Sequence, residues 1–238
     1  TIAENLAVEL LWARYIDSSI LSEAKVQEIQ KIIDRYLEIK HAVFGSGHHA
    51  SGITWDIVLG IASSEIDETI VSPLKREALV NFFYQAIRAK IPSNIQNDQR
   101  MNMLSYIAVE RAYAESDDAL IRYHLLKIIL PAWHSMSSQD VLKEVNTFTQ
   151  TIAMIQSSLI DPLSDRLSHF VRKQTPAYLL LRDFFLEADR NARHIIEDPT
   201  QFDQKLSEIA GRRYKETGAK VRRAVGRSII YIFLTKMI

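Results

Sequence analysis

The sequence predicts an all-α protein of ten or eleven helices joined by short loops. Apolar residues recur at helical spacing from end to end, and no segment alternates as a strand would. The 238 residues include only seven glycines and six prolines, too few for an all-β fold with many tight turns. A content of 47% hydrophobic and 24% charged residues is ordinary for a folded protein and excludes general disorder.

The first helices are defined by apolar residues spaced three and four apart. The clearest stripe lies in the second expected helix, at Val26, Ile29, Ile33 and Leu37. The sequence GSGHHASG then breaks the helical pattern and predicts a loop at 45–52. The helices expected around this loop are 3–17, 23–43 and 54–71.

Four later helix starts are each marked by Ser, Thr or Asp directly before a proline. The side-chain oxygen of the first residue accepts a hydrogen bond from a free backbone N–H, and proline fits where no N–H is needed. The pairs are Ser72-Pro73, Asp161-Pro162, Thr175-Pro176 and Asp198-Pro199. They begin the expected helices 73–90, 162–173, 176–196 and 199–216.

The remaining helix starts carry weaker signals. Asn97, Asp117 and Ser137 are potential N-caps for helices at 98–115, 118–135 and 138–160. Pro131 should kink or split its helix, because it removes a hydrogen bond and clashes with the preceding turn. Gly218 is expected to separate 199–216 from a last helix that runs from 219 to the end.

Short connections predict that consecutive helices pack as antiparallel hairpins. The hairpins are about as long as the units of helical-repeat proteins. They share no sequence signature, however, so a compact irregular bundle is favoured over a regular helical-repeat solenoid. We expect residues 1–238 to form a single domain or a fragment of a longer protein, with a possible seam at 92–97.

The charge of the chain is unevenly distributed. Residues 205–238 hold nine Lys and Arg against two acidic residues, whereas residues 1–204 hold 20 against 27. This basic C-terminal segment predicts binding to an anionic surface or to the acidic remainder of the chain. The anion-binding candidates are Arg212, Arg213, Lys220, Arg222, Arg223 and Arg227, and the apolar anchor that follows them is Ile229, Ile232 and Phe233.

No metal or cofactor is expected from the sequence. The chain has no cysteine, which excludes thiolate sites and a cysteine nucleophile. Glu38 and His41 have the Glu-x-x-His spacing of carboxylate-bridged di-iron bundles, but the second such motif is missing. His48 and His49 could join His41 in binding a metal, although loop histidines are usually solvated.

Two Arg–His pairs suggest metal-independent RNA cleavage, with histidine as general acid or base and arginine holding phosphate. The pairs are Arg35 with His41 and Arg190 with His194. In a chain with seven histidines such spacings arise by chance. The carboxylate pairs Asp117-Asp118 and Asp183/Glu187 are better explained as a helix cap and an exposed helix face.

The hypothesis that these observations favour is a non-enzymatic helical interaction or scaffold module. It would act inside the cell, at the cytoplasmic face of a membrane, with an unidentified protein partner and an anionic lipid surface as binding partners. The alternative is a metal-independent helical ribonuclease or another nucleic-acid-binding protein. Nucleic acid is less favoured because the rest of the chain is acidic and few aromatic residues accompany the basic ones.

Overall fold

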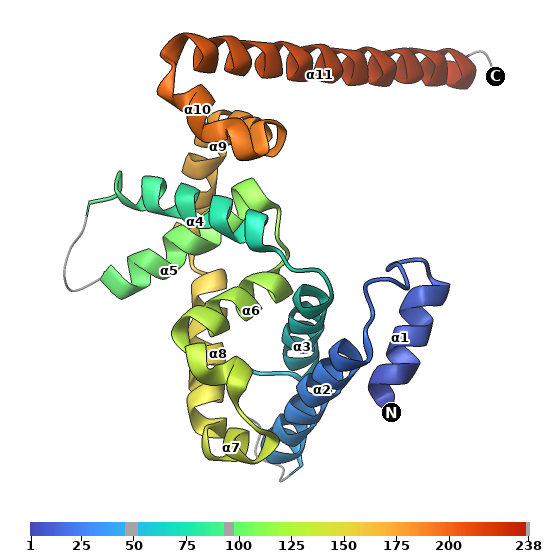
Figure 1. The fold of residues 1–238 in the computed structure, drawn as a ribbon, viewed down its shortest axis with the longest axis vertical. Coiled ribbons are helices and arrows are strands. Elements are labelled where there is room, and N and C mark those ends of the chain that lie inside the picture. Colours follow the sequence, from blue (N-terminus) through green and yellow to red (C-terminus); the bar gives the residue numbers. More distant parts are fainter. Residues whose placement is uncertain (46–51, 93–97, 237–238) are drawn as a thin grey trace. The chain divides into compact units, whose positions relative to one another are not determined.

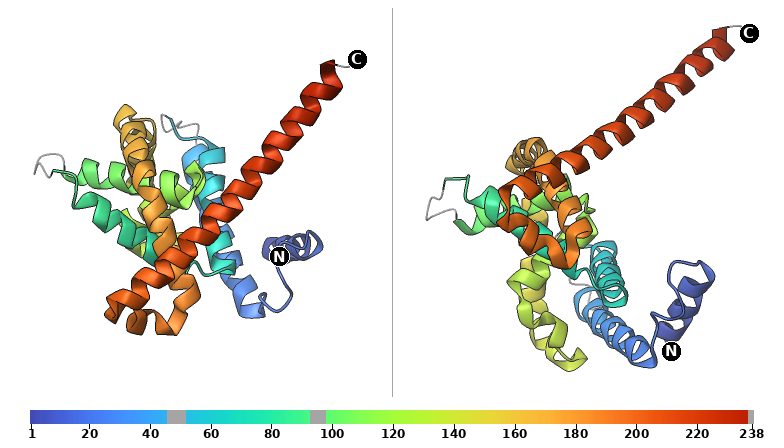
Figure 2. Two further views of the ribbon diagram at one scale, coloured as in Figure 1. Left: turned by 90° about the horizontal axis from the view of Figure 1, so that it is seen from above. Right: turned by 45° about the horizontal axis from the view of Figure 1, so that its top comes forward.

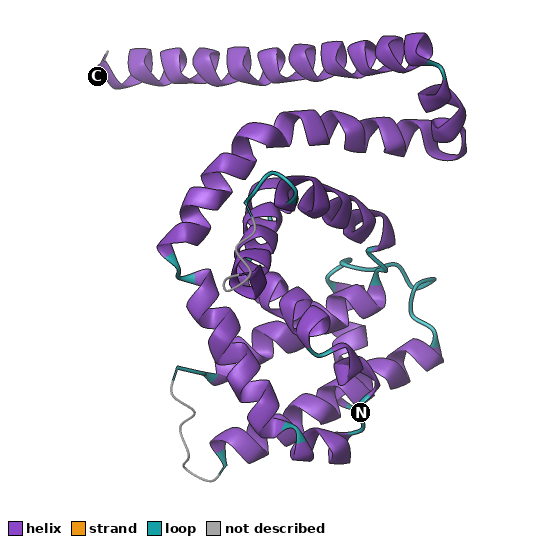
Figure 3. Ribbon diagram, turned by 90° about the vertical axis from the view of Figure 1, so that its left-hand side faces the viewer, coloured by secondary structure: helices purple, strands orange, loops and turns teal. Residues whose placement is uncertain are grey.

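The structure, a computed structural model, describes residues 1–45, 52–92 and 98–236. Helices and loops make up this part of the chain, and none of the described residues lies in a strand (Figure 3). The predicted all-α class is therefore confirmed. Contacts between residues divide the chain after Arg172 into unit 1, residues 1–172, and unit 2, residues 173–238. The seam expected at 92–97 lies almost wholly outside the described residues.

The helices are labelled in chain order in Figure 1. Helix α9 begins in unit 1 and ends in unit 2. Unit 1 contains α1 (Ile2–Trp12), α2 (Glu23–Phe44), α3 (Trp55–Ile70), α4 (Leu74–Arg88), α5 (Asp98–Val109), the π-helix η2 (Glu110–Ala114), α6 (Asp118–Ile129), the 3-10 helix η3 (Pro131–Ser135), α7 (Ser138–Lys143), α8 (Val145–Leu159) and the start of α9 (Pro162–Ala188). Unit 2 contains the rest of α9, the 3-10 helix η4 (Asp189–Asn191), α10 (Ala192–Glu197) and α11 (Pro199–Lys236).

Unit 1 is an irregular bundle in which helices distant in sequence pack together. α2 packs between α1 and α3, as expected for consecutive hairpins (Figures 1 and 2). α3 also packs on α6, and α2 packs on α7. In a solenoid each repeat contacts only its neighbours in sequence. The contacts of α3 and α2 therefore confirm the bundle and exclude the solenoid for this unit.

The core of unit 1 is built around Trp133 in η3. This side chain is fully buried, and its ring stacks on Phe148 with centroids 4.7 Å apart. The Trp133 indole N–H donates to the hydroxyl of Tyr36, 3.1 Å away. Pro131 splits the expected 118–135 helix as predicted, and the short η3 turn that results carries Trp133 into the core.

Several predicted helix starts are confirmed by their capping bonds. Asp161 accepts from the N–H of Leu163, and Asp198 accepts from Thr200 and Gln201. Asp117 and Ser137 cap α6 and α7. Ser72 does not cap α4, which begins after Pro73 without a side-chain cap.

Two expected helix breaks are wrong. Pro176 lies inside α9, and α11 continues through Gly218. A proline removes one backbone hydrogen bond but leaves those on either side, and one glycine costs a helix only about 1 kcal/mol. Packing around the buried Phe184, eight residues after Pro176, helps to retain α9. The residues of α11 after Gly218 are largely exposed, so the small cost of one glycine is what allows that helix to continue.

Other helices end earlier than expected. α1 stops at Trp12 rather than Asp17, because Arg14 adopts a left-handed conformation at φ 54°. The N–H groups of Arg14 and Tyr15 then bond to the carbonyls of Leu11 and Leu10, the pattern of a Schellman motif. Glycine usually occupies this position, so an arginine there does not predict a helix end. The expected 138–160 helix is likewise divided at Glu144 into α7 and α8.

Candidate functional site

The main polar site of unit 1 is built on one face of α3. Glu65 and Glu68 are three residues apart, so their side chains leave the helix on the same side. Both side chains are buried, at 3% and 7% exposure. Burying two carboxylates is costly unless each has charged or hydrogen-bonding partners. Those partners come from α2, α6 and the short helix η3.

Glu65 is held by groups from α2 and η3. It forms an ion pair with Arg35, and its Oε2 accepts from the hydroxyl of Tyr36 at 2.8 Å. The other oxygen is 3.0 Å from Nδ1 of His134. Arg35 also donates to the carbonyls of Trp133 and His134, each at 3.0 Å. Burial would raise the pKa of Glu65, but the His134 hydrogen bond, the Arg35 charge and Tyr36 lower it overall.

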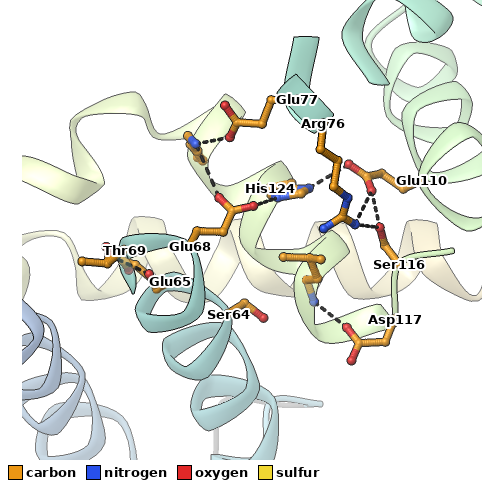
Figure 4. Close-up of polar contacts among 12 residues, drawn as sticks. Ser64, Glu65, Glu68, Thr69, Arg76, Glu77, Glu110, Ser116, Asp117 and His124 are labelled. Atoms are coloured by element: carbon orange, nitrogen blue, oxygen red, sulfur yellow. Dashed lines mark hydrogen bonds and ion pairs between the residues drawn. The ribbon is translucent and has the colours of Figure 1, made fainter. Parts of the chain in front are cut away.

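Glu68 belongs to a second cluster, centred on His124 of α6. Figure 4 shows the His124 ring between Glu68 and Glu110. Its Nε2 is 2.6 Å from Glu68 Oε1, and its Nδ1 is 2.7 Å from Glu110 Oε1. Burial would lower the pKa of His124, but the hydrogen bonds and charges of the two carboxylates raise it to about 9. In the structure as it stands, His124 is therefore a cation at neutral pH.

The π-helix η2 places Glu110 against His124. The Glu110 side chain is fully buried, and the hydroxyl of Ser116 donates to its Oε2. Arg76 donates to that hydroxyl at 2.6 Å and lies 3.9 Å from the same Glu110 oxygen (Figure 4). Wide helical turns of this kind are rare and are frequently found at functional sites.

Lys127 and Glu77 close the outer side of the cluster. The Lys127 ammonium is 2.5 Å from Glu77 Oε1 and 3.7 Å from Glu68 Oε2. These groups line a cavity of about 430 Å³, together with His124 and Glu110. Lys127 and Glu77 are 38% and 35% exposed, so solvent reaches the cavity from their side. The cavity is thus lined by the buried carboxylates of Glu68 and Glu110 and the imidazole of His124, and it is open to solvent on one side.

The sequence-predicted Arg–His pairs are not brought together into a site. Arg35 is buried against Glu65, whereas His41 is exposed on the same helix. Arg190 and His194 are both exposed. Asp117 caps α6 as expected, while Asp118 pairs with Arg111 at 3.0 Å. Among the described residues, the group suited to binding a metal does not include Glu38 or His41, and His48 and His49 lie outside these residues.

Two of the six predicted anion-binding residues are used inside unit 2. Arg212 pairs with Glu187, and Arg213 pairs with Asp183, which joins α11 to the last turns of α9. The hydrogen bond from Arg213 lowers the pKa of Asp183. Asp183 and Glu187 were expected to lie on an exposed helix face without partners. Instead they form ion pairs with Arg213 and Arg212 of the basic C-terminal segment.

The other four candidates lie further along α11. Among the residues that the structure describes, none of these four forms an ion pair with a carboxylate: Lys220, Arg222, Arg223 and Arg227. The predicted apolar anchor follows them and is exposed, with Ile229 at 49%, Ile232 at 54% and Phe233 at 63%. Figure 2 shows α11 as one continuous helix. No helix in the described ranges is both long enough and apolar enough to cross a membrane.

Comparison with known proteins gives no match to a family model, to a curated protein or to a solved structure.

The buried clusters were missed by sequence reasoning because their members are far apart in the chain. Glu68 and His124 are separated by 56 residues, and Arg35 and Glu65 by 30. One usable signal was present: Glu110 follows the apolar run Ile107–Val109, where a carboxylate would need a buried partner. The sequence did not identify that partner, because His124 comes from another helix.

Proposed function

We propose that this chain is a helical interaction module that docks on anionic membrane surfaces through the C-terminal half of α11. The observation that carries the proposal is the combination of unpaired basic residues with an exposed apolar segment in one helix. The basic residues are Lys220, Arg222, Arg223 and Arg227, and the apolar segment is Ile229–Phe233. Both features stand beyond the point where Arg213 fixes α11 to α9.

Charge complementarity favours a lipid headgroup as the occupant. After Glu216, α11 contains no acidic residue, and none of the four cations forms an ion pair with a carboxylate in the described part of the chain. Each Lys or Arg near an anionic membrane contributes roughly 1 kcal/mol, and the four together would contribute several. Anionic lipids are concentrated in the cytoplasmic leaflet, so we place the action of the module there.

The distribution of the apolar residues favours a lipid environment over a protein groove. Ile229, Ile230, Tyr231, Ile232 and Phe233 are consecutive, and all are at least 49% exposed. Successive residues are turned by about 100° around a helix, so five of them cover its whole circumference. A partner groove would bury one stripe, whereas acyl chains and headgroups surround the helix.

Co-sedimentation with lipid vesicles tests the proposal. We expect the chain to bind vesicles that contain phosphatidylserine, and to bind phosphatidylcholine vesicles much more weakly. Binding should fall steeply as salt is raised from 50 to 500 mM, because salt screens the headgroup charges. A variant with Arg222, Arg223 and Arg227 changed to Glu should lose binding, and one with Ile229, Ile232 and Phe233 changed to Ser should bind less.

The matched control changes three exposed basic residues outside this segment to Glu: Lys173, Arg190 and Arg193. It alters the net charge equally and should bind as the unmodified chain does. Equal or absent binding to the two vesicle types would overturn the proposal. Another outcome would assign the basic residues to nucleic acid. In that case the chain would not bind vesicles but would bind an RNA oligonucleotide tightly, and the Ser substitutions would leave RNA binding unchanged.

A further inference from the structure

We propose that the cavity between α3, α4 and α6 binds one divalent transition-metal ion through Glu68, Glu77 and His124. One ligand atom of each residue lies within 4.8 Å of the ligand atoms of the other two. The three residues come from three different helices, so the fold itself, rather than a local motif, brings them together. This site is independent of the membrane-docking segment of α11.

A second observation points to a missing ligand. The Glu68 side chain is 7% exposed, and its Oε2 is buried without a hydrogen-bond partner in the described residues. The Lys127 ammonium lies 3.7 Å from this oxygen, beyond hydrogen-bond distance. A buried carboxylate oxygen without a hydrogen bond is costly, and nearly all such atoms in folded proteins have a partner. A metal ion bound beside Glu68 would supply it.

The donor set defines the class of metal. One imidazole nitrogen and two carboxylates suit Mn(II), Fe(II) or Zn(II), whereas Mg(II) and Ca(II) prefer oxygen ligands alone. Glu110 completes the arrangement, since it lies 2.7 Å from the His124 nitrogen that would not bind the metal. A carboxylate in this position is the usual partner of a metal-binding histidine and fixes the orientation of the ring.

In the present structure the Lys127 ammonium lies beside Glu68 and Glu77, two of the proposed metal ligands. Its side chain is 38% exposed and lies at the open face of the cavity, so it can swing into solvent when a metal enters. The metal would then take the place of the Lys127 ammonium as the positive charge beside Glu68 and Glu77.

Electron paramagnetic resonance of Mn(II) gives a direct test, because the signal of the free ion is lost on binding. The untagged chain is titrated with MnCl₂ at neutral pH. We expect saturable binding of one ion per chain, and displacement of the bound Mn(II) by one equivalent of ZnCl₂, which such ligands bind more tightly.

Two variants should change the affinity in opposite directions. Glu77→Gln removes a ligand at the partly exposed edge of the cavity and should weaken binding by about tenfold or more. Lys127→Gln removes the competing cation and should tighten binding several-fold. The matched control is Glu115→Gln, which removes an exposed carboxylate outside the cluster and should leave affinity unchanged.

The outcomes are distinguishable. Binding of neither Mn(II) nor Zn(II), or equal binding in the unmodified chain and Glu77→Gln, would overturn the assignment and leave a purely structural ion-pair cluster. Circular dichroism of each variant establishes that it is folded. Since Glu77 is at the cavity edge, its amide replacement removes little packing, and a loss of affinity in a folded variant reports the ligand itself.

Discussion

Arg35 and Glu65 form an ion pair inside unit 1, with side chains only 4% and 3% exposed. The guanidinium also donates to two carbonyls of η3, so the pair joins α2, α3 and η3 at the centre of the bundle. Two charges buried in this way stabilise a fold only while both are present, because either alone would remain desolvated.

Removing one member of this pair should therefore be strongly destabilising. We expect Arg35→Met to lower the free energy of unfolding by about 3–5 kcal/mol, because it leaves Glu65 buried without its cation. The double variant Arg35→Met, Glu65→Leu should recover much of the loss, since an apolar pair fills a similar volume. Urea denaturation monitored by circular dichroism measures both.

A surface pair provides the control for that experiment. Arg193 and Glu197 are 91% and 61% exposed and lie one helical turn apart. Arg193→Met should change the free energy of unfolding by no more than about 0.5 kcal/mol. A similar small effect for Arg35→Met would show that the Arg35–Glu65 pair does not hold the core together.

The same carboxylate should make stability depend on acid pH. The groups that face Glu65 are Arg35 and Tyr36 of α2, Tyr123 of α6 and His134 of η3. Burial would raise the pKa of Glu65, but His134, Arg35 and Tyr36 lower it below its unfolded value of about 4.5. The resulting stabilisation is present above that value and is lost as pH falls through the folded-state pKa.

Denaturation curves between pH 7 and pH 3 will check this prediction. The unmodified chain should lose stability over the acid range more steeply than Glu65→Gln, which cannot titrate at this position. Parallel pH profiles for the two proteins would show that the Glu65 carboxylate has the same pKa in the folded and unfolded chain.

The ion pair between Asp183 and Arg213 should help to hold α11 against α9 in unit 2. Reversing one charge, in Arg213→Glu, places two acids together and should speed amide hydrogen exchange in residues 199–213. The swapped variant Asp183→Arg, Arg213→Glu restores opposite charges and should recover part of the protection. Exchange in the swapped variant as fast as in the single variant would argue against a direct contact.

Two helical glycines should respond differently to substitution by alanine. At Gly218 an added Cβ meets nothing within 4 Å, so Gly218→Ala should stabilise α11 by about 0.5–1 kcal/mol. At Gly60 the new Cβ would lie 3.1 Å from that of Ala119, which should cancel the gain. Circular dichroism at 222 nm and thermal unfolding compare the Gly218→Ala and Gly60→Ala variants. A loss of helix content in Gly218→Ala would contradict a continuous α11 and indicate a helix break at Gly218.

Local patterns in the sequence predicted the all-α class, most helix starts and the split at Pro131. These features are local: helical spacing, capping oxygens at Asp117, Asp161 and Asp198, and the missing N–H of proline act within a few residues. The sequence also located the concentration of positive charge in residues 205–238, since charge is a property of composition.

Which polar residues lie in contact depends on the packing of helices that are distant in the chain. Arg35 was proposed as a partner of His41, yet it lies against Glu65, because the packing of α2 on α3 places them together. The same applies to His124 with Glu68 and Glu110, and to Arg213 with Asp183. The helix break expected at Pro176 was wrong for a related reason, because packing around Phe184 in the same helix can offset the local cost of a proline. The break expected at Gly218 was wrong because one glycine costs a helix only about 1 kcal/mol. Local patterns fix where helices form, whereas contacts between distant residues fix which side chains share a site.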